Sequence, residues 1–500
     1  MTIEITTPQA NQPFADAVRP ILTLAAALRA DPRIDAIAFT DRSRSDHDHD
    51  PIAVAHHVAE SSGKMPLIHW AGKDRGVADL ERDLDRAQSL GMENFLFITG
   101  DKVRHPVPGR AVRYTDSVDA IRMARQRAPA LVLAGVVCPF KYREEELLGQ
   151  YLKAGKKLRA GADFLITQIG WDMPKFDELR RFLDHRGYGV PLVAELLYLT
   201  NRRARRIRRI GLPGVTVTAD LAQHLEGEAA RPDGGRAAAY SRLALQIIGL
   251  RHLGYRGVQV SGLHTYPEVA RLLEEVEARG RQCPTREQWQ QAWDESLTAP
   301  DGRKVQVAPQ NGFYLDRAPP AGVVRARPGE VAKFRLMEAI DRVAFQEGSA
   351  GARLLAPLLR RLDGRVGLGG IFLRVEKAIK HPALGCQACG FCRLPYTAFV
   401  CPETCPKGLA NGPCGGTRDN RCEFGDRECI HSEIYRLAKA TGTLAGLEAT
   451  LIPPVPEAAR GSCSWVTHFR GAGPRAINLP GPPLASGDSA AGPPSPRRAG

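Results

Sequence analysis

The chain has 500 residues, more than one ordinary domain needs, and its 43% hydrophobic and 25% charged residues are typical of a globular protein. Its longest apolar run, residues 130–140, is far shorter than the roughly 20 residues that span a bilayer. The N-terminus lacks the basic and then apolar layout of a signal peptide. This composition argues against an exported or membrane protein, so we expect a soluble, cytoplasmic one.

The net charge of +14 raises the question of nucleic-acid binding, because six arginines fall within residues 202–209. This run lies between a strand-like segment and a glycine turn, and Ile207 and Ile210 interrupt it. We therefore expect an exposed helix with solvated arginines. No aromatic stacking platform accompanies the run, so nucleic acid is not an expected partner. Anionic small ligands or an acidic protein are better uses for the charge.

Residues 1–282 alternate short apolar segments with amphipathic ones. Helical periodicity is clear in residues 77–91 and 143–161, and both stretches end on glycine. Repeated βα units predict a parallel sheet, either closed into a barrel or open. The strand-like segments are residues 2–6, 36–41, 66–72, 94–100, 131–137, 164–170, 191–197, 215–218 and 257–263.

Two features favour a (β/α)8 TIM barrel over an open doubly wound sheet. No GxGxxG motif follows the first strand, and polar residues recur where strands end. Nine strand-like segments exceed the eight that a barrel needs, so we expect residues 215–218 to be a loop excursion before the last strand. The polar strand-end residues are Thr40, Asp41, His69, Asp101, Gln168 and Glu195.

The remaining chain divides into three parts. Residues 283–328 carry Pro and Gly with little periodicity, and we expect a linker or wrapping segment. Helical patterns return in residues 329–452, which also hold a cysteine-rich block, so a small helical metal-binding domain is predicted. Residues 453–500 form a Pro/Gly-rich tail, which we expect to be disordered over its last 20 or so residues.

Eight of the 11 cysteines lie within residues 386–429. In a reducing compartment such a block binds metal rather than forming disulfides, and eight thiolates can serve two four-cysteine sites. The opening CxxCxxC resembles the start of a ferredoxin motif and favours iron-sulfur, whereas a structural zinc site remains the alternative. The expected metal ligands are Cys386, Cys389, Cys392, Cys401, Cys405, Cys414, Cys422 and Cys429.

Three motifs, IEITTP (3–8), LFITGD (96–101) and KKLRAGADFLITQIGWD (156–172), occur in order at strand ends. With them the chain resembles the methylenetetrahydrofolate reductase family, a flavin-dependent barrel, over residues 1–275. The blocks CQACGFC, CPKGLANGPCGG and CEFGDREC resemble the cysteine-rich C-terminal domain that accompanies this reductase in some bacteria and archaea. In the acetogen-type enzyme that domain is a separate subunit.

The resemblance implies roles for three residues around the substrate. Glu4 matches the general acid, which protonates the leaving folate nitrogen when the methylene-bridged ring opens. Asp101 matches an aspartate that acts beside the flavin and the pterin. Gln168 matches a glutamine that hydrogen-bonds the pterin. The implied reaction interconverts 5,10-methylenetetrahydrofolate and 5-methyltetrahydrofolate by hydride transfer through the flavin.

Thr40, His69 and Lys157 match positions that line the flavin, and Lys157 suits its phosphate. The histidine that the family carries near the fifth strand is not evident in residues 136–145, and residues 261–268 lack the arginine of the enteric enzyme. These departures leave FMN or FAD open as the cofactor. They leave NAD(P)H or a ferredoxin-like carrier open as the electron partner. A [4Fe-4S] cluster in the cysteine domain would make that domain the electron port.

Two alternatives remain. The chain could be a zinc-containing folate- or corrinoid-linked methyltransferase, since such enzymes also use barrels. It could also be a metal-stapled subunit that docks an electron carrier without catalysis. The direction of the reaction in the cell is left open, and a homo-oligomer is compatible with the sequence.

Overall fold

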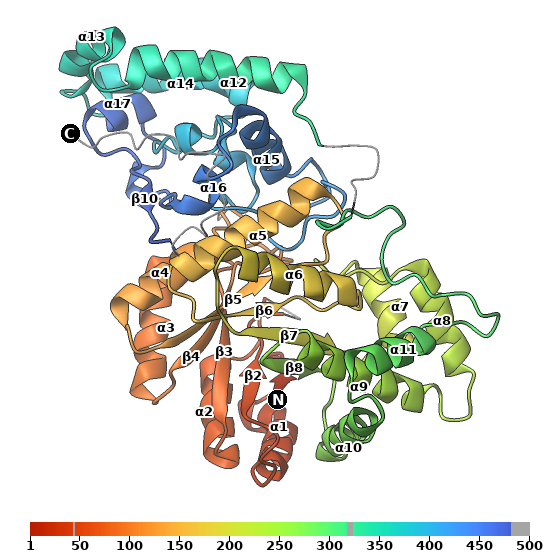
Figure 1. Ribbon diagram of the computed structural model, residues 1–500. Coiled ribbons are helices and arrows are strands. Elements are labelled where there is room, and N and C mark those ends of the chain that lie inside the picture. Colours follow the sequence, from red (N-terminus) through yellow and green to blue (C-terminus); the bar gives the residue numbers. More distant parts are fainter. Residues whose placement is uncertain (44–45, 110, 318–323, 482–500) are drawn as a thin grey trace.

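The computed structural model describes residues 1–43, 46–109, 111–317 and 324–481. Within this part eight parallel strands close into a barrel, in which each strand pairs with its neighbours in chain order and β8 pairs with β1 (Figure 1). The predicted TIM barrel is confirmed. The strands are β1 (Thr2–Ile5), β2 (Ala36–Phe39), β3 (Met65–Ala71), β4 (Asn94–Ile98), β5 (Val132–Val137), β6 (Phe164–Thr167), β7 (Leu192–Leu197) and β8 (Gly257–Ser261).

Helices surround the barrel and follow its strands. Their apolar faces pack on the outward side chains of the strands, and the two layers form the main core. Asp116 begins one of these helices, since its carboxylate accepts a hydrogen bond from the Val118 N–H at 3.1 Å. The helices are α1 (Phe14–Leu28), α2 (Pro51–Ser62), α3 (Val77–Ser89), α4 (Ser117–Arg127), α5 (Glu144–Arg159), α6 (Met173–His185), α7 (Asn201–Ile210), α8 (Ala219–Ala229), α9 (Arg236–His252), α10 (Tyr266–Gln282) and α11 (Arg286–Ser296).

Alternation along the strands determines which side chains enter the barrel. An inner apolar layer fills one part of the interior, from Ala38, Leu67, Leu96, Ala134 and Ile166. Two residues further along β2, β3 and β6, the same inward parity carries the polar residues Thr40, His69 and Gln168, whereas β4 and β5 carry Ile98 and Val136 there. The strand periodicity therefore places a packed apolar layer inside the barrel and polar side chains at its mouth, where the strands have their carboxyl ends.

The cysteine-rich part stands on one side of the barrel mouth, in contact with α5 (Figure 1). Its small core joins Phe334, Leu394, Phe399, Ile434 and Leu437. Most of the cysteines lie in loops and short turns. Its elements are α12 (Pro328–Ile340), the π-helical turn η1 (Asp341–Phe345), α13 (Ala350–Leu359), α14 (Gly367–Leu384), η2 (Leu394–Tyr396), η3 (Pro402–Thr404), α15 (Ile430–Thr441), α16 (Gly446–Ala449), β9 (Thr450–Leu451), η4 (Glu457–Ala459), α17 (Ser464–Phe469) and β10 (Ile477–Asn478).

Two boundaries differ from those predicted from the sequence. The segment predicted as a linker contains α11, because Trp289 and Trp293 are buried and Trp289 donates to the Leu245 carbonyl at 2.8 Å. The predicted tail begins too early, since residues 453–481 include α17, whose Val466 and Phe469 pack with Leu359. Residues 482–500, also predicted as disordered tail, lie outside the described part.

Two other expectations are confirmed. Residues 215–218 form a loop between α7 and α8 rather than a ninth strand. The arginine run forms α7, which ends at Gly211, a residue with a left-handed φ of 63°. Among the described residues, no helix is long and apolar enough to cross a membrane.

Buried polar contacts join the two parts of the chain. The Lys153 ammonium lies 3.0 Å from the Asp116 carboxylate and donates to the Gly412 carbonyl at 3.1 Å. On the next turn of α5, Lys156 donates to the side chain of Asn411 at 3.3 Å. Because buried ammonium groups are costly without partners, these contacts fix the cysteine-rich part against α4 and α5.

Candidate functional site at the barrel mouth

Inside the barrel mouth, side chains from non-neighbouring strands meet. The Gln259 side-chain amide on β8 donates to the Glu4 carboxylate on β1 at 3.0 Å. The same nitrogen lies 3.5 Å from Nε2 of His69 on β3. Because β3 and β8 are separated by two strands, this contact crosses the interior. The structure thus brings together Glu4 and His69, two of the predicted site residues, through Gln259.

Burial controls the protonation of this cluster. It raises the pKa of Glu4 to about 7, against a smaller lowering by the Gln259 hydrogen bond. Burial also raises the pKa of Glu195 on β7 well above its ordinary value, and the nearby Glu4 charge adds to the effect. The pKa of His69 is lowered to about 4 by burial. Near neutral pH, Glu4 can therefore hold a proton and give it up, while His69 is neutral.

The strand ends at β2, β4 and β6 carry three further predicted residues. Thr40 Oγ1 accepts from the Thr7 N–H at 3.2 Å and lies 2.9 Å from the Ser43 hydroxyl. Asp101 follows β4. Its pKa is raised first by burial and second by the charge of Glu423. Gln168 follows β6 at the inward parity of its strand. Each lies at the carboxyl edge of the barrel, where such folds place their ligands.

Lys157 is placed differently from the other predicted cofactor residues. Its ammonium donates to the Val136 carbonyl at 2.5 Å, and its side chain packs against Gly135, where a Cβ would come within 2.9 Å of it. Gly135 faces outward from the barrel, because its neighbour Ala134 belongs to the inner layer. Lys157 therefore lies between α5 and the barrel wall, and the structure does not bring it together with Thr40 or His69. Burial lowers its pKa to about 7.

The eight clustered cysteines separate into two sets of four. Burial raises the pKa of the Cys401 thiol most, and the charges of Cys386, Cys389 and Cys392 raise it further. All four cysteines line one small cavity. We call these four the first cysteine group. The pKa of Cys405 is raised by burial and then by Cys414 and Cys422, and that of Cys429 by burial, Cys414 and Cys405. We call Cys405, Cys414, Cys422 and Cys429 the second cysteine group.

Each set contains four thiols, the number of thiolates that a zinc ion or an iron-sulfur cluster binds. In their present arrangement, no three His, Cys, Asp or Glu side chains of the described residues are placed to hold a metal ion. The chemistry of the donors fits a soft metal, since four thiols share each set. The spacing of the sulfur atoms does not identify it.

The second cysteine group adjoins the strand ends that carry Asp101 and Gln168. Lys407 donates to the Gly100 carbonyl at 2.7 Å and lies 2.5 Å from the Glu423 carboxylate. Glu423 also accepts from the Lys102 N–H at 2.7 Å and from the Cys414 thiol at 3.6 Å. One buried carboxylate therefore contacts both a cysteine of the group and the segment that holds Asp101.

A second contact joins the group to β6 and the loop after α7. Gly214 packs so tightly there that a Cβ would lie 2.9 Å from the Gly415 carbonyl and 3.3 Å from the Gln168 amide nitrogen. Gly415 follows Cys414 directly. The Lys141 ammonium after β5 donates to the same carbonyl at 2.8 Å. The loop of the second cysteine group thus covers the barrel rim from β4 to β7.

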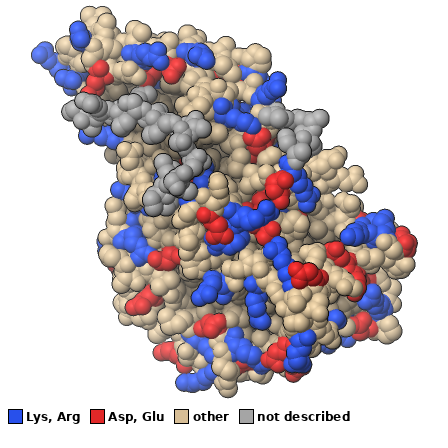
Figure 2. All heavy atoms as spheres, in the orientation of Figure 1, with Lys and Arg blue, Asp and Glu red and all other residues tan. Residues whose placement is uncertain are grey.

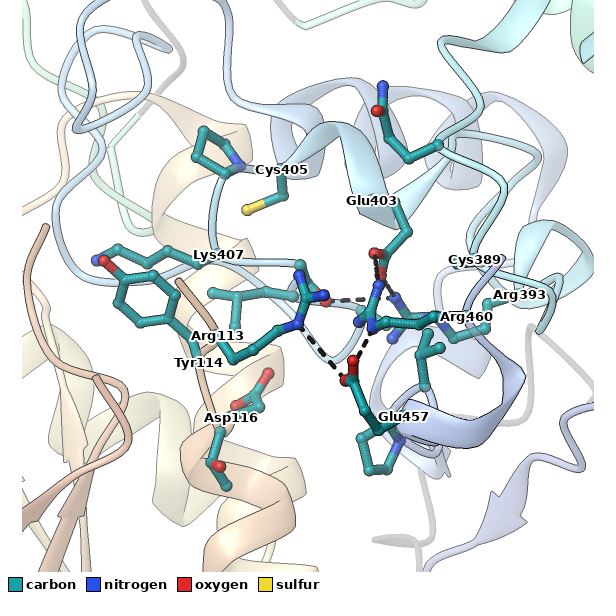
Figure 3. A pocket seen from close by; sticks show the side chains of 18 of the residues that line it. Arg113, Tyr114, Asp116, Cys389, Arg393, Glu403, Cys405, Lys407, Glu457 and Arg460 are labelled. Atoms are coloured by element: carbon teal, nitrogen blue, oxygen red, sulfur yellow. Dashed lines mark hydrogen bonds and ion pairs between the residues drawn. The ribbon is translucent and has the colours of Figure 1, made fainter. Parts of the chain in front are cut away.

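A cavity of about 1200 Å³ opens beside this rim, between the starts of α3 and α4 and the cysteine-rich loops (Figure 3). Cys389 of the first group and Cys405 of the second both line it. Arg393 and Arg460 share the Glu403 carboxylate, and both lie on the cysteine-domain side in Figure 3. The Nε atom of Arg393 is buried without a hydrogen-bond partner, whereas Nε of Arg460 lies 3.4 Å from the Glu457 carboxylate. The cavity therefore offers the Arg393 donor to an anionic ligand.

The mouth itself also holds unpaired polar atoms that suit a polar ring system. Both carboxyl oxygens of Glu195 and the side-chain oxygen of Gln259 are buried without hydrogen-bond partners. Buried polar atoms are ordinarily satisfied, so such a concentration indicates a ligand.

Sequence reasoning missed several residues of this site. Glu195 was recognised as a polar strand end without a role, and Gln259 lies in a strand whose inward parity could have revealed it. Lys407 and Glu423 had no signal, because each looks like a loop charge until the chain folds. Arg393 likewise looks like an ordinary loop charge in the sequence.

Comparisons with known proteins agree with the motifs. The sequence pattern described as "Methylenetetrahydrofolate reductase" matches residues 1–268, and that described as "Methylene-tetrahydrofolate reductase C terminal" matches residues 367–456. The chain is 23% identical over 214 residues to "Methylenetetrahydrofolate reductase 2" of Schizosaccharomyces pombe. That match covers 39% of this chain and 31% of the relative, so it spans about a third of the relative's length.

Two solved structures match a little over half of this chain. A Clostridium thermocellum protein, described as binding two copies of 5-methyl-5,6,7,8-tetrahydrofolic acid, has a TM-score of 0.42 and 14% identity, covering 56% of this chain and 94% of its own. A 2,3-dimethylmalate lyase has a TM-score of 0.32 and 14% identity, covering 59% of this chain and 91% of its own. The family pattern matches more than half of the 500 residues and includes Glu4, Asp101 and Gln168. The chain belongs to the methylenetetrahydrofolate reductase family.

Proposed function

We propose that this protein interconverts 5,10-methylenetetrahydrofolate and 5-methyltetrahydrofolate with a flavin at the barrel mouth. The carrying observation is Glu4, a buried carboxyl with a pKa of about 7, held by Gln259 inside the mouth of a barrel of this family. Thr40 and His69 lie at the same mouth and would hold the flavin, which supplies hydride exchange when bound. FMN and FAD both remain compatible with these residues.

Glu4 carries the proton chemistry. When the methylene bridge opens toward the iminium, the leaving folate nitrogen needs a proton, and the protonated Glu4 carboxyl supplies it. Its hydrogen bond from Gln259 orients the carboxyl and leaves its other oxygen for the substrate. Burial keeps the proton on Glu4 until about neutral pH, which suits an acid that must also be deprotonated within each cycle.

Asp101 and Gln168 bind the substrate in this proposal. They follow β4 and β6, on the side of the mouth that the second cysteine group covers. A carboxylate and an amide can pair with the donor and acceptor edge of a pterin. Lys157 is proposed for the flavin phosphate only if α5 shifts, because its ammonium is engaged with the Val136 carbonyl.

The cysteine-rich domain is proposed as the electron port. Support comes from two four-thiol sets, of which the second contacts the Asp101 segment through Lys407 and Glu423. Iron-sulfur clusters would carry electrons between an external partner and the flavin, and the CxxCxxC opening, which resembles a ferredoxin motif, favours [4Fe-4S]. Zinc in the same sets would make them structural, and metal analysis of anaerobically purified protein separates the two.

The test is the Glu4→Gln variant of the full chain, reconstituted with flavin and assayed for dye-linked oxidation of methyltetrahydrofolate. We expect the rate to fall about 10²- to 10⁴-fold, the usual contribution of a positioned acid or base, with the flavin absorption spectrum retained. Glu81→Gln is the matched control, because Glu81 is an exposed carboxyl on α3. Unchanged turnover in Glu4→Gln, or no flavin binding by the parent protein, would refute the proposal.

A further inference from the structure

The far end of the cysteine-rich domain exposes an unusual amount of apolar surface. The described residues expose sixteen large apolar side chains, and ten of them lie within residues 336–379. Monomeric proteins seldom leave contiguous apolar surface of this kind uncovered. We call these ten side chains the apolar face; they are Leu336, Ile340, Val343, Leu354, Leu358, Val366, Leu368, Ile371, Val375 and Ile379.

The face follows helical spacing. On α14, Leu368, Ile371, Val375 and Ile379 recur at intervals of three and four residues, which places them on one stripe. The buried residues of the same helix, such as Glu376 and Lys380, are directed into the domain instead. The stripe is therefore not the side by which α14 packs on its own chain.

The face continues into a cavity that reaches the first cysteine group. Ile340, 42% exposed, belongs to the face and also lines a cavity of about 570 Å³, together with Phe345, Trp465 and Cys392. At the inner end of this cavity the Lys380 ammonium lies 3.7 Å from the Cys392 sulfur. An apolar docking surface and a thiol of the first group are thus parts of one continuous surface.

Positive charge accompanies the face. Arg335, Arg353, Arg374 and Lys377 are exposed on the same helices, and within the part of the chain that the structure describes none of them forms an ion pair. Figure 2 shows Lys and Arg side chains along the upper end of the molecule, where Figure 1 places α13 and α14. Unpaired surface cations around an apolar centre attract an acidic partner and accelerate its encounter.

We propose that the apolar face docks a small acidic redox protein, whose cofactor exchanges electrons with the iron-sulfur cluster that the first cysteine group would hold beside Cys392. This inference rests on the proposed function, because it supplies the external end of the electron port. A second copy of the chain fits less well, since Arg374 and Lys377 would be repeated across the interface. Residues 482–500 are a poor match for the face by composition, because Leu484 is their one large aliphatic residue.

The test uses the full chain, anaerobically reconstituted, and a reduced ferredoxin of acidic composition as the probe. Binding is measured by calorimetry, and reduction of the chain by stopped-flow absorbance. We expect the Ile371→Asp/Val375→Asp variant to weaken binding and slow reduction at least about tenfold, as loss of a central apolar anchor does. Met65→Asp is the matched control, since Met65 is 51% exposed on the barrel, and it should bind as the parent does.

Charge reversal gives a second, independent readout. Arg374→Glu/Lys377→Glu should slow association and remove most of its dependence on salt, with the melting temperature unchanged. Equal binding by the parent and both face variants would overturn the proposal. It would also be overturned if the aspartate variant instead abolished a dimer of this chain, or binding to anionic phosphatidylserine vesicles, with no ferredoxin bound by the parent.

Failure of this inference can be told apart from failure of the proposed function. Dye-linked oxidation of methyltetrahydrofolate needs no protein carrier, so it should be unchanged in the face variants. Loss of dye-linked activity in the parent would refute the proposed function, while calorimetry with ferredoxin would still report on docking.

Discussion

The barrel and the cysteine-rich domain position their functional groups by different means. In the barrel, Glu4, Glu195 and Gln259 are carried by hydrogen-bonded strands over a packed inner layer. In the cysteine-rich domain, the thiols lie in loops around a small apolar core. A site on strands keeps its geometry without a ligand, whereas a site on loops needs the ligand to hold it.

The contact between the two regions joins groups held by loops to a group held by a strand end. Lys407 and Glu423 come from the loops, and Gly100 comes from the end of a strand. Glu423 links the Cys414 thiol to the segment of Asp101. The strand ends can thus set the position of the loops, and the following changes test how far each depends on the other.

The largest effect is expected from loss of a metal ligand. In Cys405→Ser the second cysteine group loses one thiolate, and metal sites of this kind contribute on the order of 10 kcal/mol to the folding of small domains. We expect calorimetry to show the cysteine-rich domain unfolding well before the barrel. Cys283→Ser, a buried cysteine outside both groups, should leave the order of unfolding unchanged. A single unaltered transition in Cys405→Ser would show that the loops hold themselves.

The next largest effect is expected from breaking the buried ion pair between Lys407 and Glu423 in the cysteine-rich domain, whose two members each contact the barrel segment after β4. Lys407→Met leaves the Glu423 carboxylate buried without its ammonium, and removing one partner of a buried pair costs about 3–5 kcal/mol. Urea unfolding should report this loss. Lys102→Met is the control, because Lys102 is an exposed neighbour with the same charge, and it should cost under about 1 kcal/mol. Similar losses in both variants would indicate a general charge effect.

The Glu4 carboxyl should give a smaller effect that depends on pH. The pKa of Glu4 rises from 4.5 in the unfolded chain to about 7 in the folded one, so the unfolded chain ionises first. The free energy of unfolding therefore falls as the pH rises from 4.5 to about 7 and stays lower above that pH. At 1.36 kcal/mol per pKa unit, Glu4→Gln should stabilise the protein by about 3 kcal/mol at pH 8 and by little at pH 4.5. Urea unfolding at the two pH values measures this, and a gain independent of pH would exclude a buried ionising Glu4.

The smallest effect is expected at the rim of the large cavity. Arg113 lies 3.6 Å from Glu457, and both side chains are largely exposed. Such pairs are worth under about 1 kcal/mol, so Arg113→Ala should hardly change thermal unfolding. If the cavity takes an anionic ligand, Arg113→Ala should change flavin or nucleotide affinity, measured by fluorescence titration, more than it changes thermal unfolding. A melting temperature lowered by many degrees would mean that the pair supports the fold.

Local patterns in the sequence predicted the barrel and much of its site. Strand and helix periods are properties of neighbouring residues, so the eight strands and the loop at 215–218 followed from them. Asp101 and Gln168 follow strands, whereas Glu4 was predicted from the family resemblance, and closure of the sheet brings Glu4 and His69 to the same side chain, Gln259. The two boundary errors arose where Trp289 and Phe469 pack on distant helices.

The sequence by itself determined that the chain is a barrel with eight clustered cysteines at its C-terminal side. Only the tertiary structure decided how the cysteines divide into two groups and that the second, through Lys407 and Glu423, contacts the segment that holds Asp101. It also placed Lys157 behind the barrel wall and joined Lys407 to Gly100, some 300 residues apart. Such contacts depend on which buried charges find partners after the chain closes, and no local period records that choice.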